Sequence, residues 1–209
     1  MKAVALKQRG RSFCRVIARE LVLVLLGAGL LTLGAKARFV VPFTMVPFTL
    51  QTFFLILLIL VYGRRAVAAV ATYLALGLAG APVFAYGGGF WYVLSPTFGY
   101  LLGFLAASLY GIVFDSRLRS PPRMVLLVLL INATVYALGW LWLASQLSLS
   151  GLSIKASLTA SFVQGVLPFF LWDLLKGYAA LYAYIVFVRT RDRAQSRISK
   201  IFQEAPKLR

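Results

Sequence analysis

Six apolar stretches that almost lack charged residues constrain this sequence more than any other feature. A helix needs about 20 apolar residues to cross the hydrocarbon core of a bilayer. The stretches cover residues 17–35, 47–62, 66–80, 97–115, 123–146 and 162–188. With 61% hydrophobic residues, a chain of 209 residues has too little polar surface for a soluble domain. The sequence therefore predicts an all-α membrane protein, with six transmembrane helices packed in one compact bundle.

The basic residues predict how this bundle is oriented. Of the 22 Lys and Arg residues, all but four fall at the termini or in the two connections that would share their side of the membrane. The exceptions are Lys36, Arg38, Lys155 and Lys176. Because Lys and Arg accumulate on the cytoplasmic side, we expect a multi-pass protein of the cell membrane with both termini in the cytoplasm.

Three regions follow from these segments. We expect a basic cytoplasmic N-terminal segment at 1–16, a six-helix transmembrane substrate-binding domain at 17–188 and a basic cytoplasmic tail at 189–209. The net charge of +17 is explained by orientation, so no nucleic-acid partner is expected. The first apolar stretch is too long for the h-region of a signal peptide, so we expect it to be retained.

The composition argues against an enzyme. The sequence contains no His and only five acidic residues, of which Asp173 alone lies well inside an apolar stretch. It therefore lacks the usual general base and the carboxylates that would hold a metal. We expect no catalytic residue, no metal and no cofactor. An intramembrane lipid-modifying enzyme is the most distant alternative.

Two connections on the side opposite the termini have the composition of a binding site. The segment 35–53 contains Pro42 and Pro47 with Thr44, Thr49 and Gln51 near them, and the uncharged segment 80–104 contains three consecutive glycines, Gly87 to Gly89. Neither can continue a helix. Irregular backbone at membrane depth is stable when it lines a cavity, so we expect a ligand cavity at the extracytoplasmic side. Two ordinary external loops are the alternative.

Asp173 and Lys176 place opposite charges inside the last apolar stretch. A spacing of three residues puts both side chains on one helix face. Intramembrane charges usually pair and mark ligand or ion pathways. Asp173 offers acceptors and Lys176 offers donors, which suits a neutral planar group with both N–H and C=O, such as a urea. Direct binding of a carboxylate by Lys176, a structural ion pair and a proton relay are the other interpretations.

Four blocks of sequence, in this order, resemble the BioY family. They are "VPFTLQTF" at 46–53, "GAPVFAYGGG" at 80–89, "SPTFGYLLGF" at 95–104 and "DLLK" at 173–176. Members of that family are the biotin-specific substrate-capture subunits, or S components, of energy-coupling factor (ECF) transporters. The resemblance implies a six-helix fold with a vitamin site open to the outside, and biotin as the ligand. An S component for another vitamin and a proton-coupled secondary transporter are the nearer alternatives.

The resemblance also implies the site and the partners. The paired Asp173 and Lys176 would bind the ligand, and Tyr100 is the first candidate for the carboxylate of biotin, ahead of Tyr86, Tyr92 and Lys155. Small residues of the first helix, Ala28 and Thr32, would dock a transmembrane coupling subunit, itself joined to two ATPase subunits; some relatives act alone or as homo-oligomers. The expected ligand-binding residues are Asp173, Lys176, Tyr100, Gly88, Phe84, Thr49 and Gln51.

Two positions depart from the family pattern. Phe98 and Trp172 stand where the family commonly has glycine. If these larger side chains point into the cavity, the site should be narrower, or should stack differently on its ligand.

Overall fold

The computed structural model describes residues 2–40, 42–113 and 120–204, and most of these are helical. The helical expectation is thus confirmed. In chain order the elements are α1 (Lys2–Lys36), β1 (Arg38–Phe39), β2 (Phe48–Thr49), α2 (Gln51–Tyr62), α3 (Arg65–Leu78), the short 3-10 helix η1 (Phe90–Leu94), α4 (Phe98–Ser108), α5 (Tyr110–Val113), α6 (Pro121–Leu149), α7 (Ile154–Gly165) and α8 (Phe170–Glu204).

Three helical segments in the described part of the chain are long and apolar enough to cross a membrane. They are Cys14–Lys36 in α1, Pro121–Leu149 in α6 and Phe170–Ser196 in α8. Three shorter apolar segments, Gln51–Tyr62, Arg65–Leu78 and Phe98–Val113, account for the second, third and fourth predicted stretches. Each of these shorter helices packs against a long one: α2 against α8 and α1, α3 against α1, and α4 against α6.

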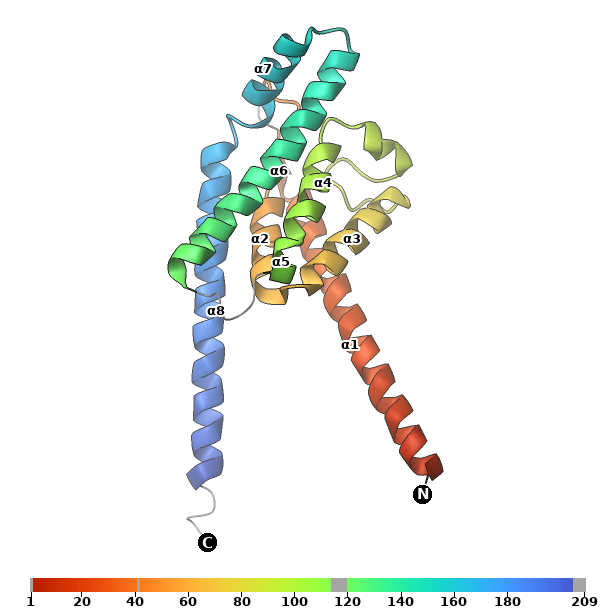
Figure 1. Ribbon diagram of the computed structural model, residues 1–209, viewed down its shortest axis with the longest axis vertical. Helices are drawn as coiled ribbons and strands as arrows, with labels where there is room; N and C mark the ends of the chain where they lie inside the picture. The colour runs from red at the N-terminus through yellow and green to blue at the C-terminus, as the bar shows by residue number, and fades with distance from the viewer. Residues whose placement is uncertain (1, 41, 114–119, 205–209) are drawn as a thin grey trace.

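The two ends of the molecule differ in character. Both termini lie at the same end, where α1 and α8 extend well beyond the other helices (Figure 1). The segments predicted as basic tails, 1–16 and 189–209, are therefore largely continuations of α1 and α8 in the residues that the structure describes. The opposite end, called the loop end below, holds the hairpin of α6 and α7 and the connection from α3 to α4 (Figure 1).

The last apolar stretch, 162–188, is not the single helix that was predicted. It is divided at 166–169, where α7 ends at Gly165 and α8 begins at Phe170. Pro168 has no N–H to donate and disfavours helical backbone at the residue before it. The chain turns there, and α7 is a separate helix of 12 residues that packs on α6. The predicted second helix likewise starts four residues late, because 47–50 contains Pro47 and β2.

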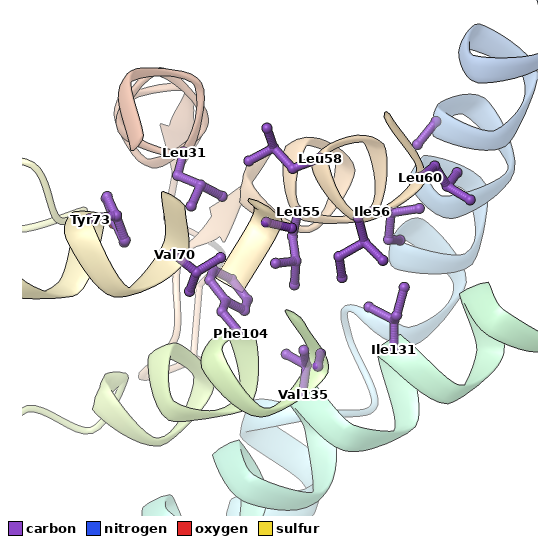
Figure 2. Packing of buried hydrophobic residues seen from close by; sticks show 14 of the residues in the cluster. Leu31, Leu55, Ile56, Leu58, Leu60, Val70, Tyr73, Phe104, Ile131 and Val135 are labelled. Carbon is purple, nitrogen blue, oxygen red and sulfur yellow. The ribbon is translucent and has the colours of Figure 1, made fainter. Parts of the chain in front are cut away.

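The core forms where five helices converge. Figure 2 shows side chains from α1, α2, α3, α4 and α6 pointing toward one another, with Leu55 of α2 and Phe104 of α4 near the centre. Leu31, Leu55, Ile56, Ile59, Val70, Tyr73 and Ile131 are fully buried. Because lipid is as apolar as these side chains, close packing is what favours helix association in a membrane.

Gly103 is one of the glycines that let α4 and α6 approach closely. A Cβ added at Gly103 would lie 2.7 Å from the Cα of Val135. Only a residue without a side chain lets the two backbones approach this closely. The contact matters for the site described next, since α4 and α6 both line it.

Candidate ligand-binding site

A cavity lies at the loop end, enclosed by segments that are far apart in the sequence. It is bounded by the residues just before and within α2, the connection into α4, the middle of α6, the end of α7 and the start of α8. Its lining consists of Val46, Pro47, Phe48, Thr49, Gln51, Thr52, Ala85, Tyr92, Thr97, Tyr100, Leu101, Phe104, Val135, Tyr136, Gly165, Phe169, Asp173 and Lys176. Five of the seven residues expected at the site, Asp173, Lys176, Tyr100, Thr49 and Gln51, are in this list.

Asp173 accepts three hydrogen bonds in the wall of the cavity. Lys176 Nζ donates to Oδ1 at 2.6 Å, the hydroxyl of Thr52 donates to the same oxygen at 2.9 Å, and the hydroxyl of Tyr136 donates to Oδ2. The residue is only 7% exposed. It also lies in the first turn of α8, where the positive end of the helix dipole favours an anion. These donors and the dipole compensate for removing a carboxylate from water.

Lys176 connects the same helix to the strand β2. Its ammonium group donates to the carbonyl oxygen of Thr49 at 2.7 Å, and lies 3.6 Å from the centre of the Phe48 ring. The predicted contact with Asp173 is present, with both side chains about one-tenth exposed. Lys176 is therefore fully engaged: one carboxylate, one backbone carbonyl and one aromatic face surround it.

Gln51 and Thr49 belong to a second polar group, at the junction of β2 and α2. The side-chain amide of Gln51 donates to the hydroxyl of Tyr73 at 2.8 Å, and the Thr49 hydroxyl lies 3.4 Å from the amide oxygen of Gln51. Tyr73 belongs to α3 and is fully buried. This chain of bonds fixes the start of α2 against α3, so the backbone of β2 is held where it faces the cavity.

Tyr100 lines the cavity, but its hydroxyl has a partner within the protein. It donates to the carbonyl oxygen of Gly165 at 2.8 Å. A Cβ at Gly165 would lie 2.3 Å from the same hydroxyl oxygen, which explains why α7 ends on a glycine. The bond ties α4 to the end of α7. Binding of a ligand carboxylate by Tyr100 would require this hydrogen to change partner.

The expected residues Phe84 and Gly88 do not line the cavity; they support the segment behind it. The ring of Phe84 is fully buried, 4.5 Å from that of Tyr92 and 5.3 Å from that of Tyr73 between ring centres. A Cβ at Gly88 would lie 2.0 Å from the carbonyl oxygen of Ala81. Both residues thus determine the shape of the connection between α3 and α4, and their contact with a ligand stays a prediction.

Phe98 and Trp172, the two larger side chains, are also outside the lining. Phe98 packs edge-on against Trp142, with ring centres 5.6 Å apart. Trp172 is 57% exposed and packs edge-on against the lining residue Phe48, with ring centres 6.1 Å apart. Neither side chain narrows the cavity directly, so this concern from the sequence does not apply to the cavity as it stands.

The residues proposed for docking a partner lie in different surroundings. Ala28 is 3% exposed and packs inside the bundle, so it is not available on the surface. A small residue also permits close packing within the chain, which the spacing alone does not distinguish, and the docking role of Ala28 stays a prediction. Thr32 is half-buried, and its hydroxyl donates to the carbonyl of Ala28 at 2.9 Å; its docking role remains a prediction.

Sequence analysis missed Thr52 and Tyr136, which contact Asp173 directly. Thr52 follows Gln51 within the block at 46–53, and Tyr136 is one of few polar side chains in the stretch 123–146. A hydroxyl in an otherwise apolar stretch is a signal that could have identified Tyr136. Within the described residues, no group of three His, Cys, Asp or Glu side chains could hold a metal ion.

Comparison with known proteins assigns the family. The sequence model of the BioY family matches residues 5–193. The chain belongs to the BioY family. Among curated BioY proteins, a probable biotin transporter from Pyrococcus horikoshii is 33% identical over 78% of this chain and 93% of its own length. A probable biotin transporter from Lysinibacillus sphaericus is 44% identical over 50% of this chain, and the alignment spans only 53% of that relative.

The fold agrees with this assignment. A crystal structure of the S component for biotin from an ECF-type ABC transporter superposes with a TM-score of 0.68, covering 85% of this chain and 93% of that one at 21% identity. With a sequence identity this low, the structural similarity establishes only that this BioY family member shares the fold of that protein. Together with its apolar helices, it makes the chain a multi-pass membrane protein.

Proposed function

We propose that this BioY family member captures biotin from outside the cell, as the substrate-binding subunit of a vitamin uptake transporter. The observation that carries the proposal is the pairing of the buried side chains of Asp173 and Lys176 in the wall of a partly open cavity. The names of its relatives and the blocks at 46–53, 80–89, 95–104 and 173–176 support the same ligand.

The chemistry of the pair suits the ureido group of biotin. A urea presents N–H donors and a carbonyl acceptor in one plane. Asp173 would accept from an N–H, and Lys176 would donate to the carbonyl. Lys176 now donates to the carbonyl of Thr49, so ligand binding would exchange one carbonyl acceptor for another. Thr52 and Tyr136 would keep the carboxylate of Asp173 oriented during this exchange.

Uptake against a gradient needs an energy source outside this chain. The sequence has no G-x-x-x-x-G-K-[ST] phosphate loop. We therefore include in the proposal a transmembrane coupling subunit and two ATPase subunits, the arrangement of an ECF transporter. The topology belongs to it too: six membrane segments between 17 and 188, both termini in the cytoplasm, and the cavity facing outside.

Replacing Asp173 tests the ligand assignment. Asp173→Asn keeps the size of the side chain but removes the charge and one acceptor. We expect biotin to bind the purified variant about ten- to a hundredfold more weakly, since a hydrogen bond to a charged group contributes about 1.5–3 kcal/mol. Isothermal titration in detergent measures the affinity.

Asp192→Asn is the matched control, because Asp192 lies in the exposed part of α8 and should not affect binding. Equal affinity of wild type and Asp173→Asn would contradict the role of Asp173. Mass spectrometry of small molecules that copurify with the wild type would separately show whether another vitamin occupies the site.

A further inference from the structure

The edge of the cavity carries an excess of positive charge. Three basic residues of the described chain lie at the loop end outside the cavity wall: Lys36, Arg38 and Lys155. Of the acidic residues in the described ranges, only Asp173 lies at this end, and Lys176 already neutralises it. Positive charge on the extracytoplasmic side runs against the usual distribution. The orientation of the protein in the membrane therefore does not explain these three basic residues.

Arg38 lies outside the lining, but it is the basic residue whose neighbours on two segments reach the cavity. In the hairpin of β1 and β2 it pairs in register with Thr49, which lines the cavity. Its guanidinium lies 4.2 Å from the centre of the Tyr86 ring, and Tyr86 directly follows the lining residue Ala85.

The other two cations are less suited to meet a ligand. Lys36 donates to the carbonyl oxygen of Phe84 at 3.0 Å, so its amine is used to hold the connection between α3 and α4. Lys155 lies near the start of α7, ten residues before Gly165, which is the α7 residue that lines the cavity. At a rise of 1.5 Å per residue this places Lys155 roughly 15 Å along the helix from the cavity.

We propose that Arg38 binds the carboxylate of the captured ligand at the edge of the cavity, while Asp173 and Lys176 hold the opposite, uncharged polar end. This assignment rests on the proposed function, since it names the residue that binds the carboxylate of biotin. A guanidinium can bind a carboxylate through two parallel N–H bonds. The face of Tyr86 holds the guanidinium in place before the ligand arrives, which reduces the entropy lost on binding.

The test compares biotin with biotinamide, which keeps the ureido ring but has no charge on its tail. Affinities of both for the full-length protein in detergent are measured for wild type, Arg38→Gln, Arg38→Lys and the control Lys155→Gln. We expect wild type to prefer biotin by about ten- to a hundredfold. Arg38→Gln should abolish this preference by weakening biotin alone, Arg38→Lys should keep part of it, and Lys155→Gln should keep all of it.

Each other result counts against the assignment. A preference that survives in Arg38→Gln overturns it, and so does an equal loss for both ligands, which would mean that Arg38 only maintains the loop. If wild type binds both ligands equally well, the carboxylate contributes nothing to the affinity. The role of Arg38 is then refuted, while biotin capture is not. If wild type binds neither ligand, biotin capture itself fails, and the carboxylate assignment fails with it.

Discussion

Asp173 is stable in a buried position because its neighbours donate hydrogen bonds to its carboxylate. Lys176 is on the same helix, but the hydroxyls of Thr52 and Tyr136 come from α2 and α6. Each carboxylate oxygen thus has a donor on it before any ligand binds. A pair without these hydroxyls would leave acceptor sites unsatisfied in a region without bulk water, which is costly.

The two hydroxyls should therefore matter for binding although they need not touch the ligand. We expect Thr52→Val and Tyr136→Phe each to weaken biotin binding about three- to tenfold, less than Asp173→Asn, because each removes one of several charge-assisted bonds that orient the carboxylate and leaves the carboxylate itself in place. Isothermal titration on the purified variants measures this. Tyr182→Phe, at an exposed position of α8, is the control, and unchanged or tighter binding in the two variants would refute the orienting role.

The pair itself could be predicted from sequence, and its hydroxyl partners could not. Asp173 and Lys176 are three residues apart, so helix geometry alone brings them together. Thr52 lies 121 residues from Asp173 along the chain and Tyr136 lies 37 residues away. Their contacts depend on how α2 and α6 pack against α8, and residue type and local spacing do not determine that packing.

At the scale of the elements, α4 and α6 form the most closely packed pair that lines the cavity. Gly103→Ala would push a methyl group against the backbone of α6. Overpacking of this kind typically costs about 1–3 kcal/mol, so we expect a lower midpoint of thermal unfolding in detergent. Because the strain falls on the cavity wall, biotin affinity should fall as well.

Gly29→Ala in α1 is the matched change, since nothing lies within 4 Å of a Cβ at Gly29. Alanine favours helix over glycine by about 1 kcal/mol, so this variant should be as stable as wild type or more so. Similar melting temperatures for Gly103→Ala and wild type would show that α4 and α6 can separate without loss.

Some helix boundaries could be predicted from the local sequence, and others could not. The apolar stretches located α2, α3 and α6 to within a few residues, whereas the stretch 97–115 contains two helices, α4 and the short α5. The division between α7 and α8 was missed because the apolar character continues unbroken across it, from 162 to 172, and hydropathy does not register a change of direction. Pro168 was the available signal, and its effect on the preceding residues indicates the turn.

At the scale of the whole molecule, the prediction concerns which end faces the cytoplasm. With Cys14 replaced by Ser, single cysteines at Ser150→Cys and Arg193→Cys lie at opposite ends of the fold, and both positions are exposed. In intact cells, a membrane-impermeant maleimide should label the cysteine at 150 at once. It should label the cysteine at 193 only after the membrane is permeabilised. The reverse pattern would invert the proposed topology, with the cavity then facing the cytoplasm.

The bond from Lys176 to the carbonyl of Thr49 has a consequence for selectivity. The carbonyl oxygen of Thr49 competes with the ligand for the ammonium group of Lys176. A ligand acceptor therefore adds to the affinity only the amount by which its bond to Lys176 is stronger than the bond to this carbonyl. Analogues that place a weak hydrogen-bond acceptor opposite Lys176 should therefore bind more weakly than the difference in their hydration alone predicts. Conversely, substitutions in the β1–β2 hairpin that weaken the bond from Lys176 to Thr49 should raise the affinity for the ligand, even where the substituted residue does not contact the ligand.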